Sequence, residues 1–175
     1  MWKRIQLFLL LLLVGIVLGA CAAAQQQGVQ AQQVPADVQT QIDAARGQFM
    51  DAYQRQDAKA LSELFAEDGT FTGTISAVWI LGREAIRANW ERLFQAFPKS
   101  RIIFRNPLIR LYNVPPRGAA VDTTVVVETG FFDMFMEDPK GQVQHTPGKY
   151  SATRVKKDGR WMLVNFHSAG LPVSR

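Results

Sequence analysis

The sequence predicts an α+β domain in which three helices precede a strongly curved antiparallel sheet. Between Asp37 and Pro98, apolar residues recur at helical spacing in three short segments. After Pro98, four long runs rich in β-branched and aromatic residues follow one another, separated by turn sequences that contain proline and glycine. Helices first and strands afterwards is an order of elements typical of α+β domains.

The three helices are expected at residues 37–53, 57–66 and 83–97. Asp37 and Asp57 are residue types that cap helix N-termini. The second helix is expected to stop at the Glu-Asp-Gly sequence of residues 67–69, and the third at Pro98, because proline does not continue a helix. Between them, residues 70–81 have the pattern of a β-hairpin. The apolar face of the first helix consists of Val38, Ile42, Ala45, Phe49 and Tyr53.

The strands are expected at residues 101–111, 119–136, 143–157 and 160–168, joined as an antiparallel meander by turn sequences such as Lys-Asp-Gly. Strands of this length usually contain bulges, which bend a sheet. The sheet is therefore expected to curve around the helices and to enclose a cone-shaped cavity.

The N-terminus has the pattern of a secretory signal peptide. Lys3 and Arg4 precede an apolar run at residues 7–18, and small residues follow it. The ending Leu-Gly-Ala-Cys at residues 18–21 resembles a bacterial lipoprotein signal, which implies that Cys21 is acylated and becomes the mature N-terminus. The alternative is a plain membrane anchor, since the apolar stretch extended through Ala24 is 18 residues long, near the lower limit for a spanning helix.

Three segments follow from this pattern: a lipoprotein signal peptide at residues 1–20, a lipidated cysteine with a flexible Gln/Ala tether at 21–36, and a folded domain at 37–175. Removal of the signal lowers the net charge from +5 to +3. We expect attachment to the extracytoplasmic side of a membrane, which is the outer membrane if the host has one, because Ala22 rather than aspartate follows the cysteine. Lysine and arginine are scattered without a dense block, so we do not expect nucleic-acid binding.

Two groups of residues, with the order of elements, carry a family resemblance. The first is FAEDG at residues 65–69 with GREAI at 82–86, and the second is TRV at 153–155, DGRW at 158–161, FH at 166–167 and GLP at 170–172. They resemble the nuclear transport factor 2-like superfamily, which includes ketosteroid isomerases, SnoaL-like cyclases and the calcium/calmodulin-dependent kinase II association domain. The C-terminal group is most similar to that association domain and to small bacterial domains of unknown function.

The resemblance allows the best-known chemistry of the superfamily to be checked. Ketosteroid isomerases use an aspartate as base and a tyrosine as oxyanion donor. An ungapped alignment places these positions at Gly73 and Phe49, neither of which can perform the role. The remaining base candidates are Glu128 and Asp133, in an apolar strand where burial would raise a carboxylate pKa, and Asp133 is the one selected. An ion pair with an arginine, or simple exposure, is the alternative.

The strand alternation assigns faces to these candidates. If Phe131 and Phe135 face the cavity, Asp133 does too, and Glu128 faces away unless a bulge near Gly130 changes the register. Tyr53 or Tyr150 would then be the proton donor. The aromatic candidates for the cavity wall are Tyr53, Trp79, Trp90, Phe94, Phe131 and Phe135.

Arg154 is the expected anchor for a ligand. It shares a strand face with Tyr150, and its Thr-Arg-Val context matches a pocket arginine of the kinase association domain. A guanidinium there would bind a carboxylate through paired hydrogen bonds. The alternative is a cross-strand salt bridge. The second pocket arginine of that family is replaced by Ser168, which makes the expected site less positive.

The last strand is expected to place His167 and Asn165 on the outer face of the sheet, together with Trp161 and Leu163. Superfamily members commonly form dimers through this face. A homodimer is therefore expected. The two histidines of the chain lack metal-ligand spacing, and no phosphate-binding loop is present, so we expect neither a metal nor another cofactor.

Three functions remain open at this stage. The first is an envelope lipoprotein that binds an unknown small molecule, largely apolar and with or without an acidic group. The second is a lyase, isomerase or cyclase that uses the same cavity. The third is a dimeric structural or assembly module.

Overall fold

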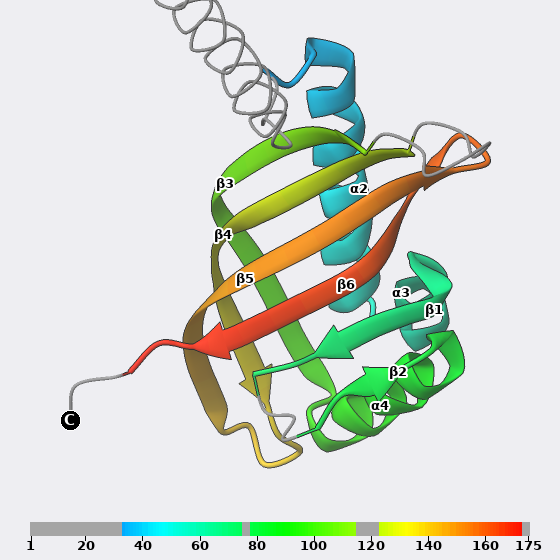
Figure 1. Cartoon of the computed structure of the whole chain (residues 1–175). Coiled ribbons are helices and arrows are strands. Elements are labelled where there is room, and N and C mark those ends of the chain that lie inside the picture. Colours follow the sequence, from blue (N-terminus) through cyan, green and yellow to red (C-terminus); the bar gives the residue numbers. More distant parts are fainter. Residues whose placement is uncertain (1–32, 75–77, 115–122, 173–175) are drawn as a thin grey trace, which may run out of the picture. The chain divides into compact units, whose positions relative to one another are not determined.

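The computed structural model describes residues 33–74, 78–114 and 123–172 (Figure 1). The expected signal peptide, Cys21 and most of the tether lie outside the described residues. The helices and strands are, in chain order, α2 (Ala36–Gln54), α3 (Ala58–Glu63), β1 (Phe65–Thr72), β2 (Ile80–Leu81), α4 (Arg83–Ala96), β3 (Lys99–Val114), β4 (Thr123–Glu137), β5 (Val143–Lys157) and β6 (Arg160–Gly170).

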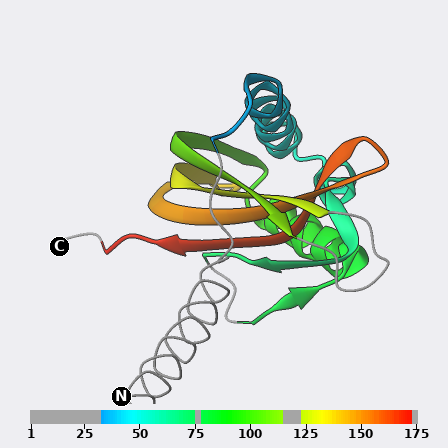
Figure 2. The ribbon, with the colours of Figure 1, turned by 45° about the horizontal axis from the view of Figure 1, so that its top comes forward.

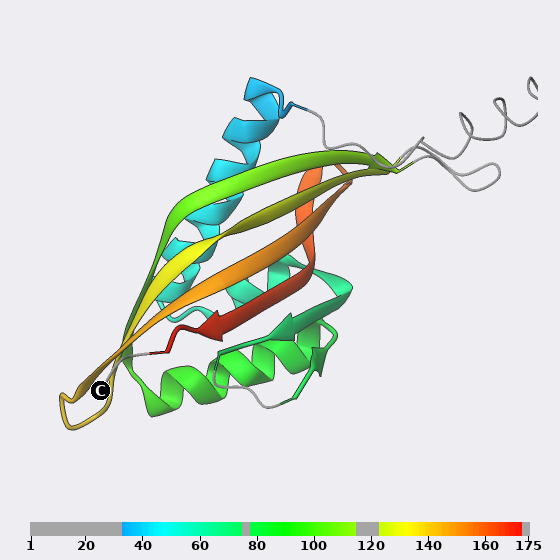
Figure 3. The same cartoon turned by 60° about the vertical axis from the view of Figure 1, so that its left-hand side comes forward.

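The strands form one sheet in the order β2-β1-β6-β5-β4-β3. Strands β3 to β6 are an antiparallel meander, as expected, but β1 pairs with β6 in parallel, so the sheet is mixed rather than wholly antiparallel. Figures 2 and 3 show the sheet curving, with α2 and α4 on its concave side. The α+β prediction is confirmed. We call the surface turned away from the helices the outer face.

Bulges accompany the curvature. The register of β3 against β4 shifts between Arg105 and Leu108, where Asn106 has a φ of 49°, and β5 against β6 shifts at Thr153/Arg154. The second shift changes the alternation along β6, so that Leu163 and Phe166 are both buried on the helix side. The expectation that Trp161 and Leu163 share the outer face with Asn165 and His167 is therefore wrong, because a bulge interrupts the two-residue period. Trp161 instead contacts α2, where its Nε1 donates to Gln41 Oε1 at 2.9 Å.

The helix ends follow local chemistry. Asp57 caps α3, since its Oδ1 accepts the Ala60 N–H at 2.9 Å. Helix α2 begins one residue earlier than expected, with Pro35 at the cap. Asp37 lies in the first turn, where its negative charge interacts favourably with the helix dipole. Helix α3 ends at Glu63 rather than near residue 67, because Phe65 already pairs with Leu163 of β6.

An aromatic core fills the space between the sheet and the helices. Phe166 of β6 lies at its centre, stacked on Phe49 of α2 at 5.4 Å and on Tyr150 of β5 at 5.8 Å between ring centroids. A smaller cluster of Ile42, Leu111, Val126 and Trp161 packs beneath the first half of α2. The two clusters fix α2 across the concave face and leave the region beside α4 open.

Candidate functional site

A cavity of about 400 Å³ lies between α4, the last turns of α2, the β1–β2 hairpin and the concave face of the sheet. Buried aromatic residues such as Phe49, Phe132 and Phe166 line its interior, whereas the exposed Val78 and Arg92 lie at its mouth. The complete lining is Phe49, Tyr53, Phe71, Gly73, Thr74, Val78, Ile80, Asn89, Trp90, Arg92, Leu93, Ala96, Phe97, Ile102, Phe132, Met134, Phe166 and Ser168.

Two of the predicted ligand-binding residues, Trp90 and Ser168, line this cavity, as does Tyr53, which was predicted as a proton donor and wall residue. The hydroxyl of Ser168 lies 3.1 Å from that of Thr74. Phe94 instead packs behind the wall, edge-on to Tyr53 at 5.4 Å between ring centroids. Trp79 is 63% exposed and does not line the cavity, although its neighbours Val78 and Ile80 do.

The predicted facing of β4 is wrong. Its alternation is unbroken, and Val126, Glu128, Phe132, Met134 and Met136 occupy the helix side. Phe131, Asp133 and Phe135 consequently lie on the outer face, and none of the three lines the cavity. The hydropathy pattern did not show which face of this strand is buried, because large apolar residues occur on both faces.

Asp133 takes part in an ion-paired group on the outer face. Its carboxylate lies 2.8 Å from Arg105 Nη2 and 2.9 Å from His145 Nε2. Phe135 stacks on the His145 ring at 4.5 Å, and the guanidinium of Arg101 lies 4.3 Å from the centroid of the Phe135 ring. This is the arginine ion pair that the sequence left open as the alternative to a catalytic role.

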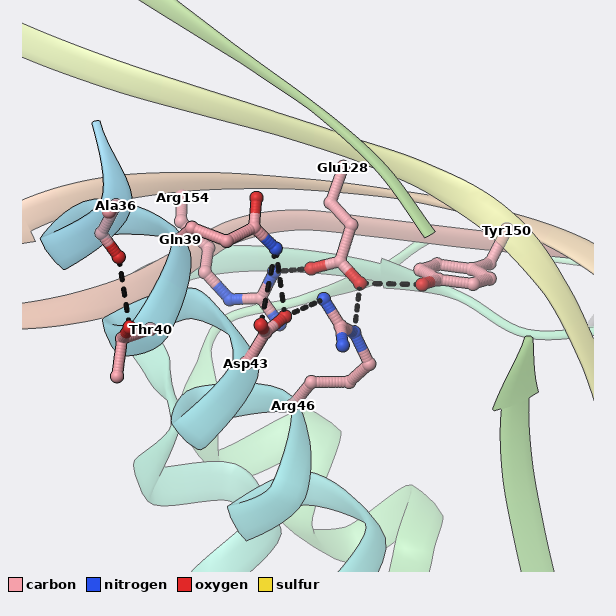
Figure 4. A network of polar contacts seen from close by, with 8 residues as sticks. All are labelled: Ala36, Gln39, Thr40, Asp43, Arg46, Glu128, Tyr150 and Arg154. Carbon is pink, nitrogen blue, oxygen red and sulfur yellow. Dashed lines mark hydrogen bonds and ion pairs between the residues drawn. The ribbon is translucent and has the colours of Figure 1, made fainter. Parts of the chain in front are cut away.

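A second polar group is buried between α2 and the sheet (Figure 4). Glu128 of β4 is fully buried and accepts three strong hydrogen bonds. Tyr150 donates its hydroxyl to Oε1 at 2.5 Å, Arg46 donates Nε to Oε1 at 2.6 Å, and Arg154 donates Nη1 to Oε2 at 2.6 Å. Arg46 also contacts Asp43 at 2.9 Å. The group joins α2, β4 and β5 and lies outside the cavity lining.

The environment fixes the charge states in this group. Burial, followed by the charge of Glu128, raises the pKa of Tyr150, so that its hydroxyl stays protonated and donates. Burial lowers the pKa of Arg154, and the Glu128 carboxylate opposes that effect. Burial also acts to lower the pKa of Arg46, but its hydrogen bond to Glu128 leaves that pKa above the usual value. The carboxylate thus lies between two cations.

Arg154 therefore occupies the cross-strand salt bridge that the sequence left as the alternative to an anion site. It is only 3% exposed and does not line the cavity. Sequence reasoning did not select Glu128 or Arg46 as members of a site. Two features of the sequence could have indicated them. Glu128 is an even number of residues from Val126 and Phe132, so the three share a strand face, and Arg46 shares a helix face with Ile42 and Phe49.

The described lining of the cavity contains no carboxylate and no imidazole that could serve as a base. Gly73 and Phe49, the positions aligned with the aspartate and tyrosine of ketosteroid isomerases, both line it. None of its described lining residues is an aspartate, glutamate or histidine. Within the described ranges, no group of three or more His, Cys, Asp or Glu side chains is suited to a metal ion.

Residues 36–167 match the model of the SnoaL-like domain. The chain belongs to the SnoaL-like domain family. No curated protein shows significant similarity to this chain. Among the helices that the structure describes, none is both long enough and apolar enough to cross a membrane.

Solved structures agree with this SnoaL-like assignment. A protein assigned as a calcium/calmodulin dependent protein kinase II association domain, from Xanthomonas campestris, is 20% identical, with a TM-score of 0.61 over 83% of this chain and 96% of that chain. A nuclear transport factor 2-like superfamily protein from Salmonella enterica serovar Typhimurium is 18% identical, with a TM-score of 0.64 over 80% and 95%.

A protein of unknown function with a cystatin-like fold, from Nostoc punctiforme, is 15% identical, with a TM-score of 0.59 over 81% of this chain and 96% of that chain. At these identities the likeness concerns the fold. Together with the SnoaL-like match, it confirms the resemblance to the nuclear transport factor 2-like superfamily.

Proposed function

We propose that this chain is an envelope lipoprotein whose SnoaL-like domain binds a small, largely apolar molecule in its cavity. The cavity itself carries the proposal. Its volume of about 400 Å³ lies in the range of small-molecule sites, and its lining is dominated by aromatic and aliphatic side chains. Burial of an apolar ligand against such walls contributes roughly 25 cal/mol for each Å² removed from water.

The placement of the titratable groups favours binding over catalysis. Asp133, the expected base, lies on the outer face, and Tyr150 donates to Glu128 outside the cavity. Tyr53 lines the cavity, and burial raises the pKa of its hydroxyl, so that the hydroxyl stays protonated and is unsuited to act as a base. A lyase, isomerase or cyclase would need a base near the ligand, and the described lining offers none.

Binding can be tested with 2-naphthamide, a neutral aromatic probe, by calorimetric titration of the full-length protein. Ala96→Phe places a large side chain at an exposed position of the cavity mouth, and we expect it to weaken binding at least tenfold. Gln95→Phe is the matched control, since Gln95 is the exposed neighbour on α4 and does not line the cavity. Equal affinity of the two variants would place the probe elsewhere and contradict the proposal.

The lipoprotein part of the proposal rests on the sequence around Cys21. Replacement of the only cysteine, Cys21→Ser, should abolish incorporation of labelled fatty acid and release the protein from the membrane fraction. The proposal assigns the protein to the extracytoplasmic side of that membrane. Unchanged fractionation of the variant would contradict lipid anchoring and favour the plain membrane anchor.

We also propose that the protein is a homodimer formed through the outer face. Three large apolar side chains, Ile103, Leu108 and Phe131, are 42–51% exposed there, and His167 is exposed on the same face. Burial of this surface in a dimer would remove apolar area from water. Sedimentation should show a dimer for the wild-type protein and a weaker one for Phe131→Ser. A monomeric wild-type protein at micromolar concentration would contradict this assembly.

A further inference from the structure

We propose that Arg92 binds the acidic group of the cavity's ligand, so that the ligand is an amphipathic anion with an apolar body and a carboxylate or similar oxyanion. The inference rests on the proposed binding function and names the class of molecule bound. It moves the anion anchor from Arg154, which is neutralised by Glu128, to a residue of α4.

Arg92 is the one charged residue among the described residues that line the cavity. Its side chain makes no ion pair or hydrogen bond with any other described residue. The other arginines of α4 are engaged: Arg83 donates to the Phe65 carbonyl at 2.8 and 3.0 Å, and Arg87 pairs with Glu91 at 2.9 Å. The guanidinium of Arg92 is therefore available to an incoming anion.

The position of Arg92 sets the orientation of the ligand. Arg92 is exposed, whereas Phe49, Phe132 and Phe166 at the other end of the cavity are buried. An arginine at such a rim keeps its charged head in water while its stem covers apolar surface, so it avoids the desolvation cost of a buried ion. The apolar body of the ligand would enter first, and its charged end would remain at the mouth.

Polar neighbours extend this end of the site. Asn89 is three residues before Arg92 on α4, so the two side chains lie on the same side of the helix, and both line the cavity. A guanidinium offers paired donors that match the two oxygens of a carboxylate, and an amide can add a third hydrogen bond. The combination recognises an oxyanion better than a neutral group of the same shape.

Other polar groups of the cavity are less suited to this role. The indole Nε1 of Trp90 and the hydroxyl of Tyr53 have no hydrogen-bond partner among the described residues, but both atoms are fully covered by neighbouring atoms. The hydroxyls of Ser168 and Thr74 are within hydrogen-bond distance of each other at 3.1 Å. Among the lining side chains, Arg92 and Asn89 thus offer a ligand the most uncovered hydrogen-bond donors.

The test compares 2-naphthoate, which is ionised at neutral pH, with 2-naphthamide, its neutral counterpart of similar shape. Both are titrated calorimetrically into the full-length protein. We expect Arg92→Gln to weaken naphthoate binding roughly three- to tenfold, the size of a partly exposed charge-assisted contact, and to leave naphthamide binding within about twofold. Arg110→Gln is the control, because it removes the same charge from an exposed position of β3 outside the cavity.

Arg92→Lys should retain part of the naphthoate preference, since a lysine keeps the charge but lacks the paired donors. Equal losses for the two probes in Arg92→Gln, or equal effects of Arg92→Gln and Arg110→Gln, would overturn the role of Arg92 while the binding function stands. Failure of the wild-type protein to bind either probe would overturn both. Because Arg92 is exposed, its replacement should leave the circular dichroism spectrum unchanged.

Discussion

Glu128 should contribute strongly to the stability of the domain. The substitution Glu128→Gln keeps the shape of the side chain and removes its charge. It leaves Arg154, which is 3% exposed, without its carboxylate partner, and leaves Arg46 with Asp43 alone. Removal of one member of a buried ion pair typically costs about 3 to 5 kcal/mol, because the remaining charge stays buried without compensation. We expect a loss of that size in the free energy of unfolding.

Asp133→Asn is the matched control on the same strand. It is also isosteric and removes one negative charge. The partners of Asp133, however, are exposed: the side chain of Arg105 is 55% exposed and that of His145 is 48% exposed. Exposed ion pairs contribute about 0 to 1 kcal/mol. Both variants are measured by urea unfolding at pH 7, followed by circular dichroism. The importance of the buried ion pair would be contradicted if Glu128→Gln lowered the free energy of unfolding by less than about 1 kcal/mol. It would also be contradicted if Glu128→Gln lowered it by no more than Asp133→Asn does.

Three further predictions concern the sheet and the helices. Because the pKa of Tyr150 is raised in the folded state, its stabilising contribution is complete below the usual tyrosine pKa of 10.0 and is lost as the pH rises above that value. In unfolding experiments, Tyr150→Phe should flatten this alkaline loss of stability, and an unchanged pH dependence would contradict the role of Tyr150. Asp57→Ala should lower the unfolding free energy by about 1 kcal/mol through loss of the α3 cap, and an unchanged melting curve would contradict the cap. Gly148→Ala should destabilise the domain by about 1 to 3 kcal/mol, since its Cβ would overlap the Phe132 ring and lie 2.7 Å from the Ala169 carbonyl oxygen. The control Gly47→Ala in α2 meets no atom within 4 Å and should stabilise the domain; equal melting temperatures of the two variants would contradict the packing.

The order of elements could be read from the sequence because each signal is local. Asp57 caps α3, Pro98 follows the end of α4, and β5 has the expected bounds of residues 143 and 157. Each of these depends on residues close together in the chain. The parallel pairing of β1 with β6 is a contact between distant segments, and no local pattern specifies it.

The faces of the strands were harder to predict because the amphipathic signal is weak. In β4, Phe131 and Phe135 on the outer face are as apolar as Phe132 and Met134 on the inner face. Hydropathy alone therefore cannot assign Glu128 to the core. The charged group became visible only when α2 brought Arg46 to the same carboxylate, a contact between residues 82 positions apart.

The cavity illustrates the same limit. Tyr53, Trp90 and Ser168 could be selected because aromatic residues and family position point to the wall. Arg92 has the sequence context of an ordinary exposed helix position. Only the cavity beside it marks Arg92 as a candidate ligand-binding residue. The alternation of β6 was misread at Leu163, where a bulge with no clear sequence signal changes the face.

Native mass spectrometry of the full-length protein, purified from its own host in a mild detergent, tests the central claim most directly. We expect a bound small molecule on the wild-type protein and on Gln95→Phe, and its loss from Ala96→Phe, whose new side chain occupies the cavity mouth. A wild-type protein that carries no adduct, or an adduct that persists unchanged in Ala96→Phe, would contradict the claim that this cavity is a binding site.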